Sequence, residues 1–314
     1  MTLAPYVRIV AQGKGRARSL TMAEAQEAMT LMLSGHAAPE AVGALLMVLR
    51  LRGETDAEIA GFTAALRGQA NIDLPAADLD WPCYAAGRTR GAPLFLLAAR
   101  LVTDAGYRVS MHSWNSHQSN AADLCGALQT CGLGGDGFHY APLETLHPMA
   151  FKLLGLRDTF GLRSCINTVL RMWNPSDAAA SVQGVFHSSY RGLQSRAAKL
   201  LGDQNLTVIK GGGGEFERNP AKQAAIFGLR DGSDLDAVAP ALIDENRKLN
   251  EPSQPIDLAA FWAGEQSDDF AYATVIGTAA LALWTLKAAQ TIPRCGAMAH
   301  DLWTDRHPRQ RRVS

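Results

Sequence analysis

The sequence predicts a small N-terminal helical domain followed by a larger α/β domain. The chain has 314 residues, of which 47% are hydrophobic, so it can bury a large core. Apolar side chains recur with a helical period between residues 21 and 67. Beyond Trp81, short apolar runs alternate with glycine-containing turns and helical patterns, which is typical of strand–helix units.

Three short helices are expected in the N-terminal part. Thr21 precedes Glu24 by three residues, and Thr55 precedes Glu58 by three. This is the spacing of a capping box, in which each side chain accepts a hydrogen bond from the other residue's backbone N–H group. Pro39 suits the first turn of the second helix, where no N–H donor is needed. The expected helices are residues 22–33, 39–52 and 56–67.

A linker is expected between the two domains. The stretch Asn71–Asp80 contains Pro75 and three aspartates, a composition that favours an irregular connection. We therefore expect a helical domain at residues 1–72 and an α/β domain at residues 73–314.

The first strand–turn–helix unit of the α/β domain suggests an anion site. We expect a strand at Cys83–Ala86, a glycine turn at 87–91 and a helix at Pro93–Ala105. The N–H groups at the start of such a helix favour an anion. Arg88 and Arg90 in the turn would add charge and planar donors for a phosphate. An equally good interpretation is two solvated loop arginines.

A second unit follows, with a strand at Tyr107–His112 and a helix at Ala121–Gln129. The loop between them is rich in Ser, Asn and His, and Asn115 and Ser119 are candidate phosphate ligands. Capping of the helix by Asn120 is the simpler interpretation of part of this loop.

The stretch after the apolar run Leu206–Ile209 is the most unusual in the chain, because a strand there breaks into four glycines followed by acidic residues. Glycines adopt positive φ and let backbone N–H groups approach a ligand, so we expect an anion, or an anion with its metal, here. A plain flexible connection is the alternative. The candidate residues are Lys210, Gly211, Gly212, Gly213, Gly214, Glu215 and Glu217.

Charge is unevenly distributed, although the 30 basic and 30 acidic residues balance over the chain. Residues 152–230 hold eleven basic and five acidic side chains and could face a phosphate-rich ligand. A helix expected at Ser189–Leu201 has a basic stripe that is either a phosphate-binding face or an ordinary solvated one. Charge alone does not establish a nucleic-acid partner.

The last part of the chain is expected to contain a strand at Ala225–Leu229, a turn at Asp231–Asp236 and a final long apolar helix at Gly277–Ala289, before a basic tail. The apolar segment Thr274–Thr291 contains Lys287 and is too short for a membrane span. The five cysteines form no Cys-x-x-Cys pair, which favours reduced thiols, and no signal-peptide pattern is present. These features predict a cytoplasmic protein without a membrane partner.

Two groups of motifs resemble the anthranilate phosphoribosyltransferases of glycosyltransferase family 3. The first group is Leu20-Thr21-x-x-Glu24 and Leu49-Arg50-x-x-Gly53-Glu54-Thr55-x-x-Glu58, and the second is His147-Pro148, Lys152, Arg157, Gly161-x-Arg163-Ser164-x-Ile166-Asn167 and Asn174-Pro175. The resemblance implies a mostly parallel central sheet, helices from 160–180 that join the small domain, and a homodimer formed through the N-terminal helices.

The resemblance also assigns roles to individual residues. The arginine that matches Arg163 lies against the aromatic acceptor in that family, and the residue that matches Asn167 lies in the same cleft. A buried helix-cap role is the competing interpretation of Arg163.

The sequence departs from the family where the chemistry takes place. The first phosphate loop is short and carries Arg88 and Arg90 in place of glycines, and Leu170-Arg171 stands where Gly-Pro is expected. The adjacent Asp-Glu pair that holds magnesium on the pyrophosphate in the family has lost one carboxylate. Displacement of pyrophosphate needs a metal, so Glu215 and Glu217 are weak candidates for a magnesium site.

Three functions follow from these departures. The first is nonspecific binding of DNA or RNA, because a branch of the family with a degenerate active site binds DNA through a basic groove. The second is transfer of a glycosyl or phosphoribosyl group from phosphoribosyl pyrophosphate, with magnesium, to an acceptor other than anthranilate. The third is a dimeric scaffold with a vestigial pocket. The candidate ligand-binding residues are Arg88, Arg90, Asn115, Ser119, Arg163, Asn167, Arg171, Lys210, Gly211, Gly212, Gly213 and Gly214.

Overall fold

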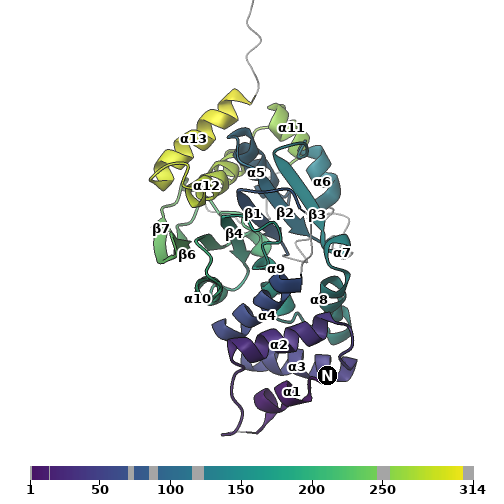
Figure 1. Cartoon of the computed structure of the whole chain (residues 1–314). Coiled ribbons are helices and arrows are strands. Elements are labelled where there is room, and N and C mark those ends of the chain that lie inside the picture. The colour runs from purple at the N-terminus through teal and green to yellow at the C-terminus, as the bar shows by residue number, and fades with distance from the viewer. Residues whose placement is uncertain are drawn as a thin grey trace, which may run out of the picture.

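A computed structural model describes residues 2–13, 15–69, 74–84, 91–114, 124–245 and 255–306. A helical bundle forms one end of the molecule, and a sheet flanked by helices forms the other (Figure 1). This is the predicted fold class. Among the described residues, no helix is long and apolar enough to cross a membrane.

The helices and strands follow one another along the whole described chain. The helices are α1 (Ala4–Ala11), α2 (Met22–Leu33), α3 (Pro39–Arg52), α4 (Asp56–Gln69), α5 (Phe95–Asp104), α6 (Leu124–Thr130), α7 (Leu143–Leu146), α8 (Pro148–Phe160), α9 (Ile166–Arg171), α10 (Tyr190–Leu201), α11 (Leu258–Ala263), α12 (Asp269–Thr285) and α13 (Ile292–Asp305), with a 3-10 turn η2 at Gly212–Gly214. The strands are β1 (Leu79–Cys83), β2 (Val109–Ser113), β3 (Phe138–Pro142), β4 (Ala180–Val185), β5 (Asn205–Lys210), β6 (Ala224–Arg230) and β7 (Ser233–Ala239).

The helical bundle begins as its capping signals predict. Thr21 Oγ1 accepts the Glu24 N–H group at 3.2 Å, and the Glu24 carboxylate accepts the Thr21 N–H group at 2.8 Å. Thr55 and Glu58 form the same reciprocal pair at the start of α4. The fully buried Glu58 carboxylate also accepts from the Arg52 guanidinium, so a single acid stabilises the end of α3 and the start of α4.

The sheet is mostly parallel. Its strand order is β3-β2-β1-β4-β5-β6-β7. The first five strands in this order pair in parallel, whereas β6 and β7 pair antiparallel at one edge. Every residue of β1, β2 and β4 is buried, as expected for central strands covered on both faces. The carboxyl ends of β1, β4 and β5 therefore lie at one edge of the sheet.

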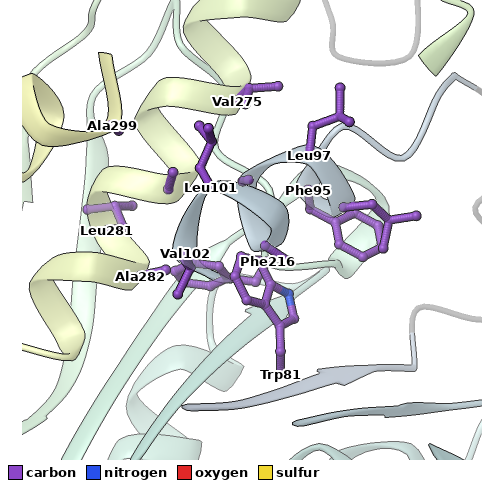
Figure 2. Packing of buried hydrophobic residues seen from close by; sticks show 14 of the residues in the cluster. Trp81, Phe95, Leu97, Leu101, Val102, Phe216, Val275, Leu281, Ala282 and Ala299 are labelled. Atoms are coloured by element: carbon purple, nitrogen blue, oxygen red, sulfur yellow. The ribbon is translucent and has the colours of Figure 1, made fainter. Parts of the chain in front are cut away.

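Two hydrophobic cores cover the two faces of the sheet. Trp81 and Phe216 belong to the first core, which is formed against α5, α12 and α13 (Figure 2). The second core contains Val208 from β5 and Ile166 from α9 together with the buried side chains of α2, α3 and α4. The limits of the two domains stay a prediction, because residues 70–73 lie outside the described residues.

Several predicted elements in the α/β domain have other bounds. The strand expected at Cys83–Ala86 is β1, which begins four residues earlier, inside the expected linker. Its early residues include Asp80, whose burial depends on partners from other strands. The strand expected at Tyr107–His112 is shifted to β2. Both strands contain buried polar side chains, such as Asp80 and His112, so their bounds are hard to predict from apolar runs.

The C-terminal region departs furthest from the prediction. The residues expected to form a turn, Asp231–Asp236, run largely into β7, an edge strand. Its aspartates are exposed and resemble turn residues, while Leu235, Ala237 and Ala239 pack toward the first core. The expected helix Gly277–Ala289 is α12, which starts at Asp269. A further helix, α13, follows where the tail was expected; Thr291 caps it.

Candidate functional site

The candidate site lies where the carboxyl ends of β1 and β5 approach α9. Asn167, in α9, donates from Nδ2 to the backbone carbonyl oxygen of Tyr84 at 3.2 Å, immediately after β1. Arg171 ends α9 and donates from Nη1 to the Asn167 carbonyl oxygen at 3.4 Å. The chain between α8 and α9 carries Arg163. Three residues singled out in the sequence are thus held on one short helix and the segment before it.

Arg171 is a buried cation. Only 7% of the residue is exposed. Burial lowers the pKa of its guanidinium, and the nearby Glu215 carboxylate opposes this change. Buried charges in proteins are normally paired, so the acid next to Arg171 is a structural requirement of the site.

Several arginines share this acid. Burial lowers the pKa of Arg163, and repulsion by Arg157 and Arg171 lowers it further, whereas Glu215 raises it. Arg50, which is exposed on α3, repels Arg163 more weakly. We call Arg157, Arg163 and Arg171 the arginine group. Its three guanidinium groups repel one another through Arg163, so the group favours an anionic ligand.

Arg157 also belongs to the site, although the sequence indicates it only as one residue of a family motif. It lies in the last turn of α8, with its guanidinium carbon 5.9 Å from the ring centroid of Trp114. Trp114 follows β2 directly and is buried. Neither residue was a site candidate, because their proximity to Arg163 depends on how α8 and β2 pack and has no local signature.

The tetraglycine loop after β5 is a compact turn. Gly213 has φ 64°, and a Cβ atom on Gly211 would lie 1.6 Å from the Glu215 carbonyl oxygen, so close packing alone requires glycine there. Three glycine N–H groups donate to backbone carbonyl oxygens of the protein: Gly211 to Val185, Gly212 to Glu217 and Gly214 to Gly211. Lys210 is exposed at the end of β5. Binding of a ligand by this loop stays a prediction.

The acids after the glycines are held in place by the protein. Glu217 is fully buried, and its Oε2 accepts the Phe95 N–H group at the start of α5 at 2.9 Å. Phe216, between the two acids, is part of the first core, 5.4 Å from Trp81 in an edge-on ring contact (Figure 2). Glu217 thus provides negative charge at a helix N-terminus, where a ligand anion was expected to do so.

Of the two acids after the glycines, Glu215 stays a candidate ligand for a magnesium ion, whereas Glu217 is already used within the protein. Magnesium prefers several oxygen ligands in octahedral geometry, and usually one or two carboxylates hold it. Phe216 supplies no oxygen ligand, and Glu217 is bonded to α5. Within the described ranges, no cluster of three or more His, Cys, Asp or Glu side chains is arranged to hold a metal.

A buried polar network under the site was not foreseen. His112 Nε2 lies 3.1 Å from Asp80 Oδ1, its Nδ1 lies 2.9 Å from the Tyr84 hydroxyl, and Ser181 donates to Asp80 at 3.0 Å. Burial, and then Asp80, raise the pKa of Tyr84 well above its usual value, so its hydroxyl stays protonated and shares a hydrogen bond with His112. The network fixes the end of β1, where Asn167 is bonded.

The remaining predicted ligand residues are not part of the described site. Arg88, Arg90, Asn115 and Ser119 are outside the described residues. The expected basic stripe on α10 is used within the protein. It consists of Arg191, which donates to the Ala225 carbonyl oxygen, Arg196, which pairs with Asp56 at 2.9 Å, and Lys199, which pairs with Asp234 at 2.7 Å.

Comparison with known proteins places these features in context. Residues 5–70 match the family model described as the helical bundle domain of the glycosyl transferase family. The anthranilate phosphoribosyltransferase of Geobacillus kaustophilus is 28% identical over 90% of this chain and 90% of its own. That of Symbiobacterium thermophilum is 31% identical over 72% of this chain and 69% of its own.

Solved structures show the same fold. Anthranilate phosphoribosyltransferase from Thermus thermophilus superposes with a TM-score of 0.76 at 22% identity, covering 92% of each chain. The Saccharomyces cerevisiae enzyme in complex with PRPP and Mg gives a TM-score of 0.74 at 16% identity, covering 97% of this chain and 94% of its own.

Proposed function

Because the chain belongs to the anthranilate phosphoribosyltransferase family of glycosyltransferase family 3, we propose that it binds a phosphorylated ribose at the arginine group, without magnesium. The yeast relative was solved with PRPP and Mg, which makes phosphoribosyl pyrophosphate the first ligand to test. This proposal keeps the ligand of the transferase hypothesis but not its magnesium ion, and it concerns binding of the ligand and not transfer of its ribose.

One observation carries the proposal: Arg157 and Arg171 both act on the half-buried Arg163, and the Glu215 carboxylate acts on Arg163 and Arg171, while the neighbouring acid Glu217 bonds to α5. In a site that uses magnesium, acids hold the metal and the metal neutralises the phosphates. Here the arginines can neutralise the phosphates directly through charge-assisted hydrogen bonds. The ligand's phosphates would in turn supply negative charge to balance the arginines.

Calorimetry with phosphoribosyl pyrophosphate tests this proposal. We expect binding that persists in EDTA, and an affinity about tenfold lower in Arg163→Gln, because a hydrogen bond to a charged group is lost. Arg196→Gln is the matched control, since it removes the same charge from the exposed pair with Asp56. Binding only in the presence of magnesium would overturn the proposal and favour a metal-dependent transferase.

Nucleic-acid binding is the second candidate. Lys210 is exposed at the end of β5, and Arg50 is exposed on α3 and acts on Arg163; both could contact a phosphate backbone. Two of the α10 cations, Arg196 and Lys199, are already paired with aspartates. Arg171 is buried, which suits an enclosed small anion better than a polymer. Titration with unrelated oligonucleotides at low and moderate salt decides: affinity that falls steeply with salt supports nucleic acid.

The homodimer formed through the N-terminal helices also stays a proposal. Sedimentation of the full chain tests it, and a monomer at all protein concentrations would contradict it.

A further inference from the structure

Three buried N–H donors beside Arg163 have no acceptor. They are Arg157 Nη1, Arg171 Nε and Trp114 Nε1, and the statement holds for the described part of the chain. Trp114 is 8% exposed, Arg171 is 7% exposed, and the Arg157 side chain is 12% exposed. Because nearly all buried polar groups in proteins are hydrogen-bonded, three such donors in one region call for an acceptor-rich partner.

The three donors belong to elements that meet at the site. Arg157 lies in the last turn of α8 with its guanidinium near the Trp114 ring, and Arg171 ends α9. Arg163 lies in the segment between these helices and interacts with both arginines. The donors are therefore held on packed helices and at a strand end, and their positions are set before a ligand arrives.

The charges indicate how much negative charge the partner carries. Glu215 is the acid that interacts with Arg163 and Arg171. Asp158 lies 3.8 Å from Arg157, but its side chain is 73% exposed, so water screens that pair. Arg157 Nη1, Arg171 Nε and Trp114 Nε1 together offer three donors, one more than the two oxygens of a carboxylate ligand can each accept singly. A phosphate monoester supplies a charge of about −1.5 to −2 and three acceptor oxygens.

We propose that Arg157, Arg171 and Trp114, together with Arg163, form a subsite for the doubly charged oxyanion of a phosphate monoester. The inference rests on the proposed function, since it concerns the same site, and it defines the ligand class further. Arg171 stands where the family motif has proline, so this chain adds a guanidinium next to the arginine that resembles the acceptor-binding one. The ligand that reaches Arg163 thus carries a phosphate group and not a lone carboxylate.

The test compares two ligands that share a ring and differ in their charged group. Phenyl phosphate and benzoate are titrated into the full chain by calorimetry in EDTA at pH 7.5. We expect phenyl phosphate to bind at least about tenfold more tightly, because it makes more charge-assisted hydrogen bonds. Equal affinity for the two ligands, or a preference for benzoate, would overturn the inference.

Acidification adds a second readout. The second pKa of a phosphate monoester is about 6, so at pH 5 phenyl phosphate is mostly a monoanion and should bind more weakly. Glu215, Asp158 and His147 are titratable protein groups near the subsite, together with Cys83 and Tyr84, which act on Arg171. Protonation of any of them would strengthen anion binding. A fall in affinity therefore reports the ligand's own charge, and an unchanged or higher affinity contradicts a dianion subsite.

Variants assign the contacts. Arg157→Gln and Arg171→Gln should each weaken phenyl phosphate binding about tenfold or more, and Trp114→Phe, which keeps a ring but removes the donor, should weaken it less. Arg196→Gln should leave it unchanged. Thermal unfolding identifies any variant that fails to fold; Arg157 is the less buried arginine and gives the safer test. Folded variants that bind as tightly as the natural chain would overturn the inference.

The two proposals fail in different ways. Binding of phosphoribosyl pyrophosphate in EDTA without selective binding of phenyl phosphate would remove only the subsite. Selective binding of phenyl phosphate without binding of phosphoribosyl pyrophosphate would remove the proposed function and leave the subsite. An effect of inorganic phosphate equal in the natural chain, Arg157→Gln and Arg171→Gln would reveal an adventitious ion only and contradict the subsite.

Discussion

The arginines of the candidate site differ from those at the far end of the α/β domain, around α11 and α13 (Figure 1). There, Arg306 donates to the carbonyl oxygens of Trp262 and Trp303 and lies 3.9 Å from the Trp303 ring centroid. Arg100 donates to the Cys131 carbonyl oxygen at 2.6 Å and lies 4.1 Å above the Trp262 ring.

The two regions use the same side chain for different purposes. At the far end, the guanidinium groups donate to carbonyl oxygens and lie over ring faces, and none of their buried donors lacks an acceptor among the described residues, so these arginines join helices. At the candidate site, Arg157 and Arg171 keep N–H groups without acceptors among the described residues. An arginine whose donors are all used contributes to stability, whereas one with donors left over is available to a ligand.

The largest expected effect is a loss of stability on substitution in the far-end region. Trp303 is buried and makes ring contacts with Phe261, Trp262 and Tyr272. Trp303→Ala should reduce the free energy of unfolding by about 3–5 kcal/mol through loss of contacts and the cavity left behind. Urea unfolding measures this change. Phenyl phosphate affinity of the folded fraction should stay constant, and a parallel loss of affinity would show that the two regions are coupled.

The next effect concerns the buried network beneath the site. Tyr84→Phe removes the hydroxyl that is hydrogen-bonded to His112 Nδ1 and leaves a buried ring nitrogen unsatisfied. Such a group costs about 1–3 kcal/mol, so the free energy of unfolding should fall by that amount. Tyr190→Phe is a matched control, because its hydroxyl bonds to the half-buried Glu54 and its loss should cost less. Equal losses in both variants would show that the network has no special importance.

The sequence predicts the two regions unequally well. Arg163 and Asn167 were found because they belong to a contiguous motif, and the capping boxes of α2 and α4 were found because their partners are three residues apart. Arg157 and Trp114 were missed as ligands because they meet only through tertiary packing. Local signals predict local contacts, so a site assembled from separate elements is only partly visible in the sequence.

The buried network and the C-terminal helix were missed for different reasons. Asp80 and His112 are 32 residues apart and meet because β1 and β2 pair in parallel. A buried aspartate in an aspartate-rich stretch looks like part of a linker until its strand partner is known. The α13 helix carries a local signal, Thr291 before Pro293, that a compositional interpretation of the tail overlooked.

A smaller effect of opposite sign sharpens the comparison between the arginines. Arg171→Met replaces an incompletely satisfied buried cation with an apolar side chain, and such replacements are often neutral or stabilising by about 1 kcal/mol. We expect unchanged or higher stability in urea together with loss of anion binding. Arg306→Met should instead destabilise, because it removes satisfied contacts with Trp262 and Trp303. Destabilisation by both variants would contradict the distinction between the two regions.

The smallest effect comes from a surface pair in the helical bundle, where every partner is satisfied. Glu24 bonds to the Arg18 guanidinium at 2.6 Å and to the Thr21 N–H group. These contacts, the arginine first, lower the pKa of the Glu24 carboxyl to about 2. A carboxyl with a lowered pKa stabilises the fold above its unfolded value, near 4.5, and this contribution disappears as pH falls toward 2.

Glu24→Gln should therefore cost about 0.5 kcal/mol in urea unfolding at pH 6.5, since exposed pairs contribute little. The difference from the natural chain should shrink as pH falls from about 4.5 to 2. Glu40→Gln is the control, because Glu40 is also an exposed carboxylate in the first turn of a helix and shares any helix-dipole effect. If the Glu24→Gln difference were the same at both ends of this range, the carboxylate's charge would not be its source. The pair would then act through side-chain packing, and the contrast with the incompletely satisfied arginines would rest on the far-end region alone.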